Sequence, residues 1–396
     1  MKPELLSPIK DYVSLQAAIQ AGADAVYFGL KELSMRHNAK NFQIKDFKKI
    51  KEICKKNKVK AYLTLNTIIY NNEINKIKEI LEKAKQAKID AIIAWDFAVI
   101  NEANKLNLKI HLSTQSSIAN FEAIKILKKH FKNIERVILA RELSLSQIKS
   151  IISKLKKEKI NVQIETFIHG AMCVSVSGRC FLSQDIFNKS ANRGNCLQPC
   201  RRKYLVKDIE EDHELELGED YVLSPKDLCT LPFIEKLTKS GITCFKIEGR
   251  NRSQEYVKTV TEVYREAINN KKHNKKDLLK KLKTVYNRGF STGFYLGKTI
   301  DQWTKAYGSK ATKKKTYIGK IINFYKNIKV AEIKVEAHGL KIGDTLMVQG
   351  NKTGVLEQKI TSMEKNHKQI TKIIKGPVAI KLNKIAREND KVFIIK

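Results

Sequence analysis

The chain lacks the features of a membrane or exported protein. No apolar run reaches the about 18 residues that a membrane-spanning helix needs. The first residues, MKPELLSPIKDY, contain no hydrophobic segment of the kind that directs secretion. Hydrophobic residues make up 42% of the chain and charged residues 30%, which is the balance of a globular protein. We therefore expect a cytoplasmic protein with no membrane partner.

Acidic residues are scarce relative to basic ones. The chain has 41 Asp and Glu against 76 Lys and Arg, which gives a formal net charge of +35. Such an excess attracts polyanions, and nucleic acids in particular. Lysine-rich helix faces in contact with water, such as KDFKKIKEICKKNK, explain part of the excess without any partner. The charge alone leaves nucleic-acid binding and a generally lysine-rich composition both open.

Motifs of several enzyme classes are also missing. No glycine-rich fingerprint opens a helix, as it would in a dinucleotide-binding fold. The sequence contains no nucleophile elbow or recognisable catalytic triad, and no His-Glu-x-x-His zinc motif. A peptidase activity would therefore need an unassigned mechanism.

The first part of the chain repeats one unit, a short apolar run followed by an amphipathic helix. The runs are 4–8, 24–30, 60–66, 90–96, 109–115, 136–142, 161–170 and 243–250. They are typical of parallel strands buried on both faces. Eight such units predict an α/β fold, a TIM-like (β/α)8 barrel over residues 1–265 with an insertion at 171–240. An open doubly wound sheet is the alternative, and the run 221–228 is an alternative barrel strand.

The pattern changes after residue 265. Residues 266–312 are expected to form a helical and aromatic linker. From 313 to 396, short alternating strands and glycine-containing turns predict a small C-terminal antiparallel β-barrel domain. This domain is also basic, and small barrels of this kind often bind RNA.

Polar side chains lie at the carboxyl ends of the predicted strands, where the active sites of such barrels lie. The candidate substrate-binding residues among them are Asn66, Gln115, Arg141, Glu142, Glu248 and Arg250. Guanidinium groups match carboxylates with paired hydrogen bonds, so Arg141, Arg250 and Arg252 are candidates to hold an anionic substrate. A structural ion pair is the alternative for each arginine.

Glu165 and His169 are the candidate catalytic pair. They lie on one predicted strand, and residues four apart on a regular strand share a face, so both would point into the barrel mouth as acid and base. The alternatives are structural. Glu165 would be an ion-pair partner of Arg250 or Lys246, and His169 a packed ring bonded to the backbone.

Cysteines are clustered along the chain. Five of the seven lie between Cys173 and Cys229, and in a reducing cytosol such clustering indicates metal or redox chemistry rather than disulfides. Four thiolates suit an iron–sulfur cluster. A four-cysteine zinc site is one alternative. Buried, inert cysteines are the other, and this description suits Cys54 and Cys244.

The segment ETFIHGAMCVSVSGRCFLS, residues 165–183, closely resembles the signature of the collagenase-like peptidase family, also called peptidase family U thirty-two. Further matching segments are NRGNCLQPCRRKY (192–204), LSPKDLC (223–229) and FKIEGRNRSQEYV (245–257). The resemblance implies a [4Fe-4S] cluster. By motif position its ligands would be Cys173, Cys180, Cys196 and Cys229, with Cys200 as the rival for one place.

The same resemblance implies an activity. It points to oxygen-independent hydroxylation of RNA, foremost of the tRNA wobble uridine to 5-hydroxyuridine with prephenate as the oxygen source, and otherwise of rRNA. The family name implies proteolysis instead. A third hypothesis is a non-catalytic iron–sulfur scaffold that binds RNA. Since some relatives act in pairs, a homodimer or a heterodimer with a related chain is also open.

Overall fold

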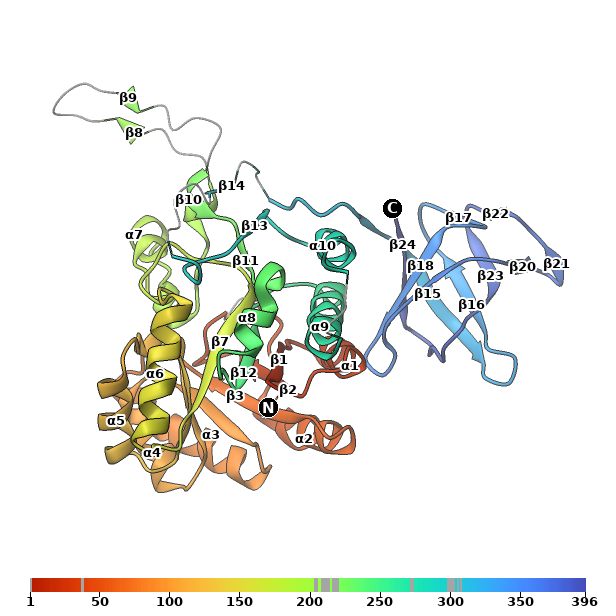
Figure 1. The fold of residues 1–396 in the computed structure, drawn as a ribbon. Helices are drawn as coiled ribbons and strands as arrows, with labels where there is room; N and C mark the ends of the chain where they lie inside the picture. Colours follow the sequence, from red (N-terminus) through yellow and green to blue (C-terminus); the bar gives the residue numbers. More distant parts are fainter. Residues whose placement is uncertain are drawn as a thin grey trace.

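The computed structural model describes residues 2–36, 39–202, 221–270, 274–297, 303–304, 306 and 308–396, with the backbone of 206–207 and 214–215. Parts of the predicted insertion 171–240 and of the predicted linker 266–312 lie outside these residues. A barrel is followed along the chain by a smaller antiparallel sheet (Figure 1). Within the described ranges, no helix is long and apolar enough to cross a membrane.

Eight parallel strands form the barrel. They are β1 (Glu4–Pro8), β2 (Ala25–Gly29), β3 (Lys60–Leu65), β4 (Ala91–Ala94), β5 (Ile110–Leu112), β6 (Ile134–Ile138), β7 (Gln163–Gly170) and β12 (Cys244–Ile247). Strand β12 pairs in parallel with both β1 and β7, which closes the ring. These strands are almost entirely buried, as their apolar sequences require. The predicted (β/α)8 barrel is confirmed, and an open doubly wound sheet is excluded.

Helices cover the outside of the ring. They are α1 (Tyr12–Gln20), α2 (Phe47–Lys56), α3 (Ile74–Gln86), α4 (Phe97–Lys105), α5 (Phe121–His130), α6 (Leu145–Lys157), α8 (Ile234–Thr238) and α9 (Gln254–Asn269), with α10 (Lys275–Lys283) beside α9. Several begin at a polar cap. The Asp96 carboxylate accepts hydrogen bonds from the backbone of Ala98, at 2.9 Å, and of Ile69, at 3.0 Å. Asp96 therefore starts α4 rather than facing the barrel mouth.

The insertion between β7 and β12, together with the segment that follows α10, builds a second layer over one edge of the barrel mouth. Strand β11 (Asp227–Cys229) pairs antiparallel with the end of β7, and β13 (Phe290–Ser291) pairs with β11. Beyond them lie α7 (Leu182–Phe187) and the pair β10 (Tyr221–Pro225) and β14 (Trp303–Thr304). Neither β10 nor β11 belongs to the closed ring, so the alternative that 221–228 is a barrel strand is wrong.

The C-terminal part is an antiparallel sheet around its own apolar core. Its strands are β15 (Lys315–Tyr325), β16 (Val330–Val335), β18 (Thr345–Gly350), β19 (Gly354–Lys359), β20 (Glu364–Lys365), β21 (Lys368–Gln369), β23 (Gly376–Lys381) and β24 (Lys391–Ile395), with β17 (Leu340–Lys341) and β22 (Lys372–Ile373) as a separate pair. The core includes Ile318, Ile333 and Val392. The predicted antiparallel β architecture is confirmed.

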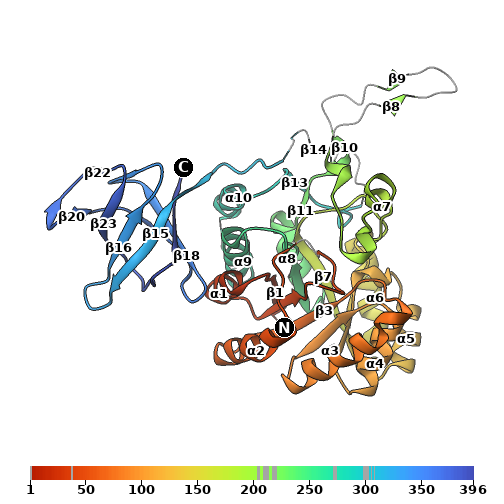
Figure 2. The ribbon, with the colours of Figure 1, turned by 180° about the vertical axis from the view of Figure 1, so that it is seen from behind.

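The sheet packs against the barrel through α1 and α9, which Figure 2 shows between the two bodies. Ala17 of α1 is buried against Met347 and Val355. Beside this contact, the Lys315 ammonium lies 3.0 Å from the Glu255 carboxylate. Apolar contact and a partly buried ion pair thus fix the basic sheet to the outside of the barrel, against α1 and α9.

Candidate functional site

A small polar cavity lies at the carboxyl ends of the barrel strands. Five of the six predicted substrate-binding residues line it: Asn66, Gln115, Arg141, Glu248 and Arg250. They come from the ends of different strands, which is why residues so far apart in sequence meet here. Its volume is about 60 Å³. The sixth residue, Glu142, lines a neighbouring pocket instead.

Positive charge dominates the cavity. Arg36, Arg141, Lys246 and Arg250 line it, against the single carboxylate of Glu248. A nitrogen of Arg36 lies 3.2 Å from the Glu248 carboxylate. Burial alone would raise the pKa of Glu248, but the charges of Arg36, Arg252 and Arg141 outweigh burial and lower it. This electrostatic environment favours a bound anion.

Arg250 anchors the loop that follows β2. The residue is 3% exposed, and its guanidinium donates to the Thr64 hydroxyl at 2.7 Å, the Ser34 hydroxyl at 3.0 Å and the Met35 carbonyl at 2.6 Å. Burial lowers the pKa of Arg250 to about 10. A side chain at Gly29 would collide with this guanidinium, since a Cβ there would lie 2.3 Å from Nη2. Arg250 therefore holds the wall of the cavity in place as well as lining it.

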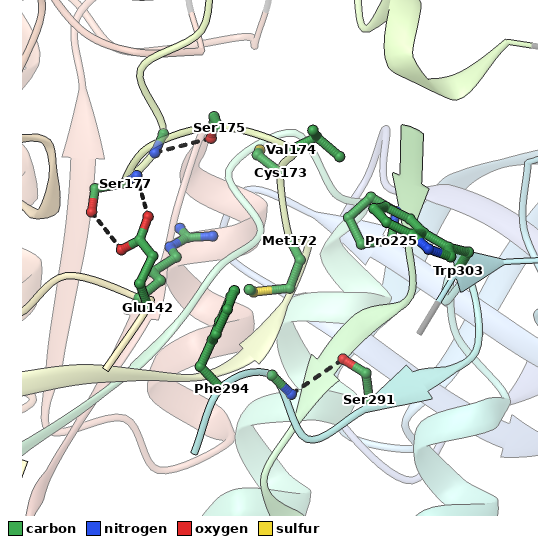
Figure 3. Close-up of a pocket in the computed structure, with 13 residues that line it drawn as sticks. Glu142, Met172, Cys173, Val174, Ser175, Ser177, Pro225, Ser291, Phe294 and Trp303 are labelled. Carbon is green, nitrogen blue, oxygen red and sulfur yellow. Dashed lines mark hydrogen bonds between the residues drawn. The ribbon is translucent and has the colours of Figure 1, made fainter. Parts of the chain in front are cut away.

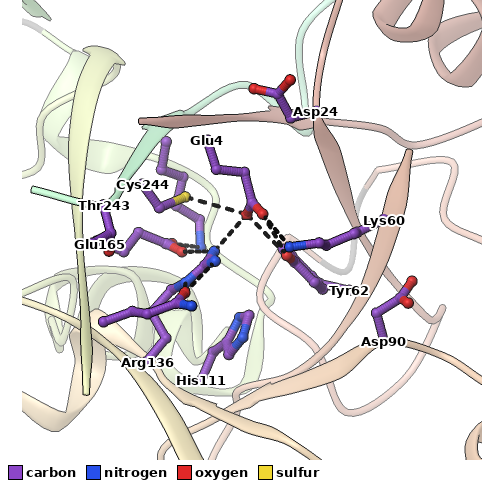
Figure 4. Close-up of polar contacts among 12 residues, drawn as sticks. Glu4, Asp24, Lys60, Tyr62, Asp90, His111, Arg136, Glu165, Thr243 and Cys244 are labelled. Atoms are coloured by element: carbon purple, nitrogen blue, oxygen red, sulfur yellow. Dashed lines mark hydrogen bonds and ion pairs between the residues drawn. The ribbon is translucent and has the colours of Figure 1, made fainter. Parts of the chain in front are cut away.

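Glu165 lies deep inside the barrel, below this cavity. Its carboxylate accepts from Lys246 Nζ at 2.8 Å and from Arg136 Nη1 at 3.1 Å, and Arg136 also donates to Glu4 at 2.7 Å (Figure 4). Burial would raise the pKa of Glu165, but Lys246 and Arg136 outweigh it and lower the pKa. The side chain is fully buried. Of the two readings of Glu165, the structure favours the ion-pair partner over the catalytic group.

His169 faces away from the barrel interior. In the pairing of β7 with β12, Phe167 lies opposite Lys246 and His169 opposite Ile247, so β7 carries one extra residue at this point. Such a bulge reverses the alternation of side chains. The His169 ring consequently packs against Tyr256 and Tyr264 of α9, with Nδ1 3.3 Å from the Tyr264 hydroxyl. The structure does not bring Glu165 and His169 together as an acid–base pair.

The environment of His169 predicts a pH effect on stability. Burial lowers its pKa from 6.5 to about 4, so between these values the unfolded chain binds a proton that the folded chain excludes. Its contribution to stability is present above pH 6.5 and is lost as the pH falls towards 4. Replacing His169 by Phe keeps the ring packing and should flatten the fall of the melting temperature over this interval. Equal slopes for variant and parent would contradict this prediction.

The cysteine loop, residues 171–202, begins with a sharp turn at the end of β7. Gly170 has φ +109°, and a Cβ there would lie 2.5 Å from the Glu248 carbonyl, so only glycine fits. Glu142 then holds the loop, since its carboxylate accepts from the backbone of Ser177 at 2.6 Å and from its hydroxyl at 2.8 Å. Arg201 ties the far end down by donating to the Ser224 hydroxyl at 2.8 Å.

Four thiols gather along this loop: Cys173, Cys180, Cys196 and Cys200. Burial raises the pKa of Cys196, and the neighbouring Cys173 and Cys180 raise it further. Burial likewise raises the pKa of Cys200, with added effects from Cys173 and Cys196. Each thiol is therefore within electrostatic range of others. As the side chains stand, no three His, Cys, Asp or Glu residues in the described ranges are arranged to hold a metal ion.

Cys229 lies elsewhere. It is 2% exposed, sits on β11 opposite His169, and contacts the Tyr264 hydroxyl at 3.7 Å. Burial raises its pKa to about 11, and no other thiol contributes to that shift. Motif position predicts Cys229 as the fourth ligand, whereas Cys200, the rival for that place, is the thiol that Cys173 and Cys196 influence.

The thiols adjoin the polar cavity. Although burial lowers the pKa of Arg36, the charges of Glu248, Cys173 and Cys196 together raise it. Arg36 thus pairs with the Glu248 carboxylate of the cavity and is also influenced by two of the loop thiols. Sequence reasoning missed Arg36, and it named Lys246 only as an ion-pair partner of Glu165 and not as a residue of the cavity. Arg36 follows β2 within a loop and has no strand-end signal, whereas Lys246 is one residue among many lysines.

A second, apolar pocket of about 270 Å³ lies beneath the loop (Figure 3). Its walls include Met172, Val174, Pro225, Phe294 and Trp303, and Cys173 lines it as well. Arg141 lines both this pocket and the polar cavity. One loop of cysteines, one polar cavity and one apolar pocket therefore adjoin at the barrel mouth.

Comparisons with known proteins agree with this picture. The model of Peptidase family U32 matches residues 10–305. An uncharacterized protease of Methanocaldococcus jannaschii is 44% identical over 404 residues, covering 99% of this chain and 98% of that protein. A collagenase of Porphyromonas gingivalis is 42% identical over 404 residues, covering 98% and 97%. A tRNA hydroxylation protein of Bacillus subtilis is 35% identical over 357 residues, covering 87% and 82%. The chain belongs to Peptidase family U32, as the signature around Cys173 predicts.

Proposed function

We propose that the chain hydroxylates RNA without molecular oxygen, converting the wobble uridine of tRNA to 5-hydroxyuridine. The observation that carries the proposal is the contact between the cysteine loop and a cation-lined cavity. Arg141 lines the cavity and donates to the Ala171 carbonyl of the loop at 2.9 Å, and Arg36 is influenced by Glu248, Cys173 and Cys196. A relative over most of the chain is named a tRNA hydroxylation protein, which supports RNA as the substrate. The net charge of +35 fits a polyanionic partner.

A [4Fe-4S] cluster on the loop would supply redox chemistry. The donor set fits such a cluster, since four thiolates are its usual ligands and the loop carries four thiols, among which Cys173 and Cys180 influence Cys196, and Cys196 influences Cys200. We assign Cys173, Cys180, Cys196 and Cys200 to it. Metal binding commonly orders its own ligands, so thiols on loop segments are suited to close around a cluster.

The cavity would bind the oxygen donor, a small carboxylate such as prephenate. Arg36 and Arg141 supply guanidinium groups, and the amides of Asn66 and Gln115 lie beside them. About 60 Å³ is room for one carboxylate group rather than a whole dicarboxylate. We expect the donor to place one carboxylate here and to extend towards the thiols. In the overall reaction the donor gives up one oxygen atom and accepts two electrons, while the base exchanges C5–H for C5–OH.

The geometry supports peptide hydrolysis less well, although two relatives are named a protease and a collagenase. His111 bonds Glu135 at 3.0 Å, and His169 bonds Tyr264 at 3.3 Å. Both rings are buried, so neither of these barrel histidines is positioned to activate a serine or a cysteine at the mouth. The experiment that follows therefore includes a measurement of peptidase activity.

Mass spectrometry of nucleosides from a deletion strain tests the proposal. We expect 5-hydroxyuridine and its derivatives to disappear from tRNA and to return with the wild-type gene. A gene carrying Arg36→Gln should yield about one tenth or less of the 5-hydroxyuridine that the wild-type gene restores, because a charge-assisted hydrogen bond is worth about 1.5–3 kcal/mol. Arg387→Gln, the same change at an exposed site on the C-terminal sheet, should restore it fully.

Unchanged nucleosides in both tRNA and rRNA of the deletion strain would refute the RNA-hydroxylase function. Loss of a hydroxylated nucleoside from rRNA alone would keep the reaction and reassign the substrate. Gelatin cleavage by the purified protein, together with unchanged nucleosides, would favour the peptidase.

A further inference from the structure

The proposed function leaves the apolar pocket beneath the cysteine loop without an occupant, although Cys173, an assigned cluster ligand, lines it. We propose that it receives a single nucleobase, turned out of the RNA chain, as the seat of the base that reacts. The inference rests on the proposed function and adds the place and the means of base recognition.

The walls are suited to a flat aromatic ring. Phe294 and Trp303 come from different segments, and Pro225 lies beside Trp303 because β10 and β14 pair at these two residues (Figure 3). Met172 and Val174 complete the apolar surface. Stacking on an aromatic side chain is worth about 1–3 kcal/mol per base in single-stranded nucleic acid complexes. A volume of about 270 Å³ holds one base with room to spare.

The rim offers hydrogen bonds to a base. The Ser175 hydroxyl accepts from the Gly178 backbone at 3.1 Å, and the Ser291 hydroxyl accepts from the Gly293 backbone at 3.3 Å. Each hydroxyl thereby keeps its own hydrogen to donate, and a pyrimidine carbonyl is a matching acceptor. An aliphatic peptide side chain would leave these donors unused, so the rim favours a base over the side chain of a peptide substrate.

The pocket lies next to the cysteine loop and the polar cavity. Cys173 and Arg141 both line the pocket. The Arg141 guanidinium stacks 3.9 Å above the Phe167 ring and donates to the Ala171 carbonyl at 2.9 Å, while its Nε is buried without a hydrogen-bond partner among the described residues. Since Arg141 also lines the polar cavity, a base in the pocket would be separated from the donor by this one side chain.

Tryptophan fluorescence tests the proposal directly. The chain has two tryptophans, so Trp95→Phe leaves Trp303 as the sole emitter. The full-length, anaerobically purified variant would be titrated with uridine monophosphate and, separately, with ribose 5-phosphate. We expect saturable quenching by the nucleotide and none by the sugar phosphate. Phe294→Ala in the same background should weaken nucleotide binding about tenfold, which corresponds to about 1.4 kcal/mol of stacking.

A matched control is Phe97→Ala, which removes an aromatic ring that is 62% exposed on α4, outside the pocket, and which should leave the titration unchanged. Equal quenching by both ligands, no quenching by the nucleotide, or no effect of Phe294→Ala would overturn the base site. Quenching with intact RNA modification in a deletion strain would keep the pocket and refute the hydroxylase. Loss of RNA modification in the deletion strain without quenching by the nucleotide would keep the hydroxylase and refute the base site.

Discussion

Serine in place of Cys196 is expected to abolish iron and sulfide binding by the anaerobically purified protein. Cys173 and Cys180 contribute to the raised pKa of Cys196, and Cys196 contributes to that of Cys200, so each of the other three loop thiols interacts with Cys196. A hydroxyl does not replace a thiolate as a cluster ligand under ordinary conditions. Iron and acid-labile sulfide analysis, together with the visible absorption of the cluster, would measure the loss.

Two further variants decide the fourth ligand. Cys200→Ser should lose the cluster in the same way, whereas Cys229→Ser should retain iron, because Cys229 is buried beside Tyr264 on β11. The reverse result would restore the assignment by motif position. Zinc in place of iron, in protein prepared without oxygen, would contradict the iron–sulfur proposal while leaving the ligand set intact.

Alanine in place of Glu165 is expected to lower the free energy of unfolding by about 3–5 kcal/mol, because removing one partner of a buried ion pair leaves uncompensated charge. Glu165 is the fully buried centre of a network in which Lys246 and Arg136 lie 2.8 and 3.1 Å from its carboxylate. Denaturant titration of the purified variant would measure the loss.

The exposed pair of Glu158 with Lys125 offers a control. Glu158→Ala should change stability by less than about 0.5 kcal/mol, as surface substitutions usually do. If Glu165 were instead a catalytic acid or base, Glu165→Gln would retain the parent's stability and lose RNA modification. That combination would contradict the structural role given to Glu165.

The architecture follows from local sequence patterns. All eight barrel strands coincide with apolar runs, because strands buried on both faces must be apolar along their whole length. Five residues of the polar cavity could be predicted from their position at strand ends, because the barrel fold brings those ends together. The antiparallel C-terminal sheet followed from alternation and turns. These features depend on the periodic spacing of apolar residues, which can be read from a single sequence.

The errors arise where one residue changes the geometry. The extra residue near Ile168 in β7 turned His169 outwards, and no local composition marks that bulge. The depth of Glu165 depends on Arg136 and Glu4, which are distant in sequence. Arg36 reaches the cavity from a loop whose position is fixed by Arg250. Long-range contacts of this kind carry no pattern along the chain.

The most direct measurement is a single-turnover reaction under anaerobic conditions. Full-length protein with its iron content measured would be mixed with tRNA from the deletion strain and with prephenate carrying a heavy-oxygen label on its ring hydroxyl. We predict 5-hydroxyuridine that carries the label, and none when Cys196→Ser replaces the parent. Product formed equally by the Cys196→Ser protein, or no product from iron-loaded parent protein that cleaves gelatin, would contradict an RNA hydroxylase built on the loop thiols.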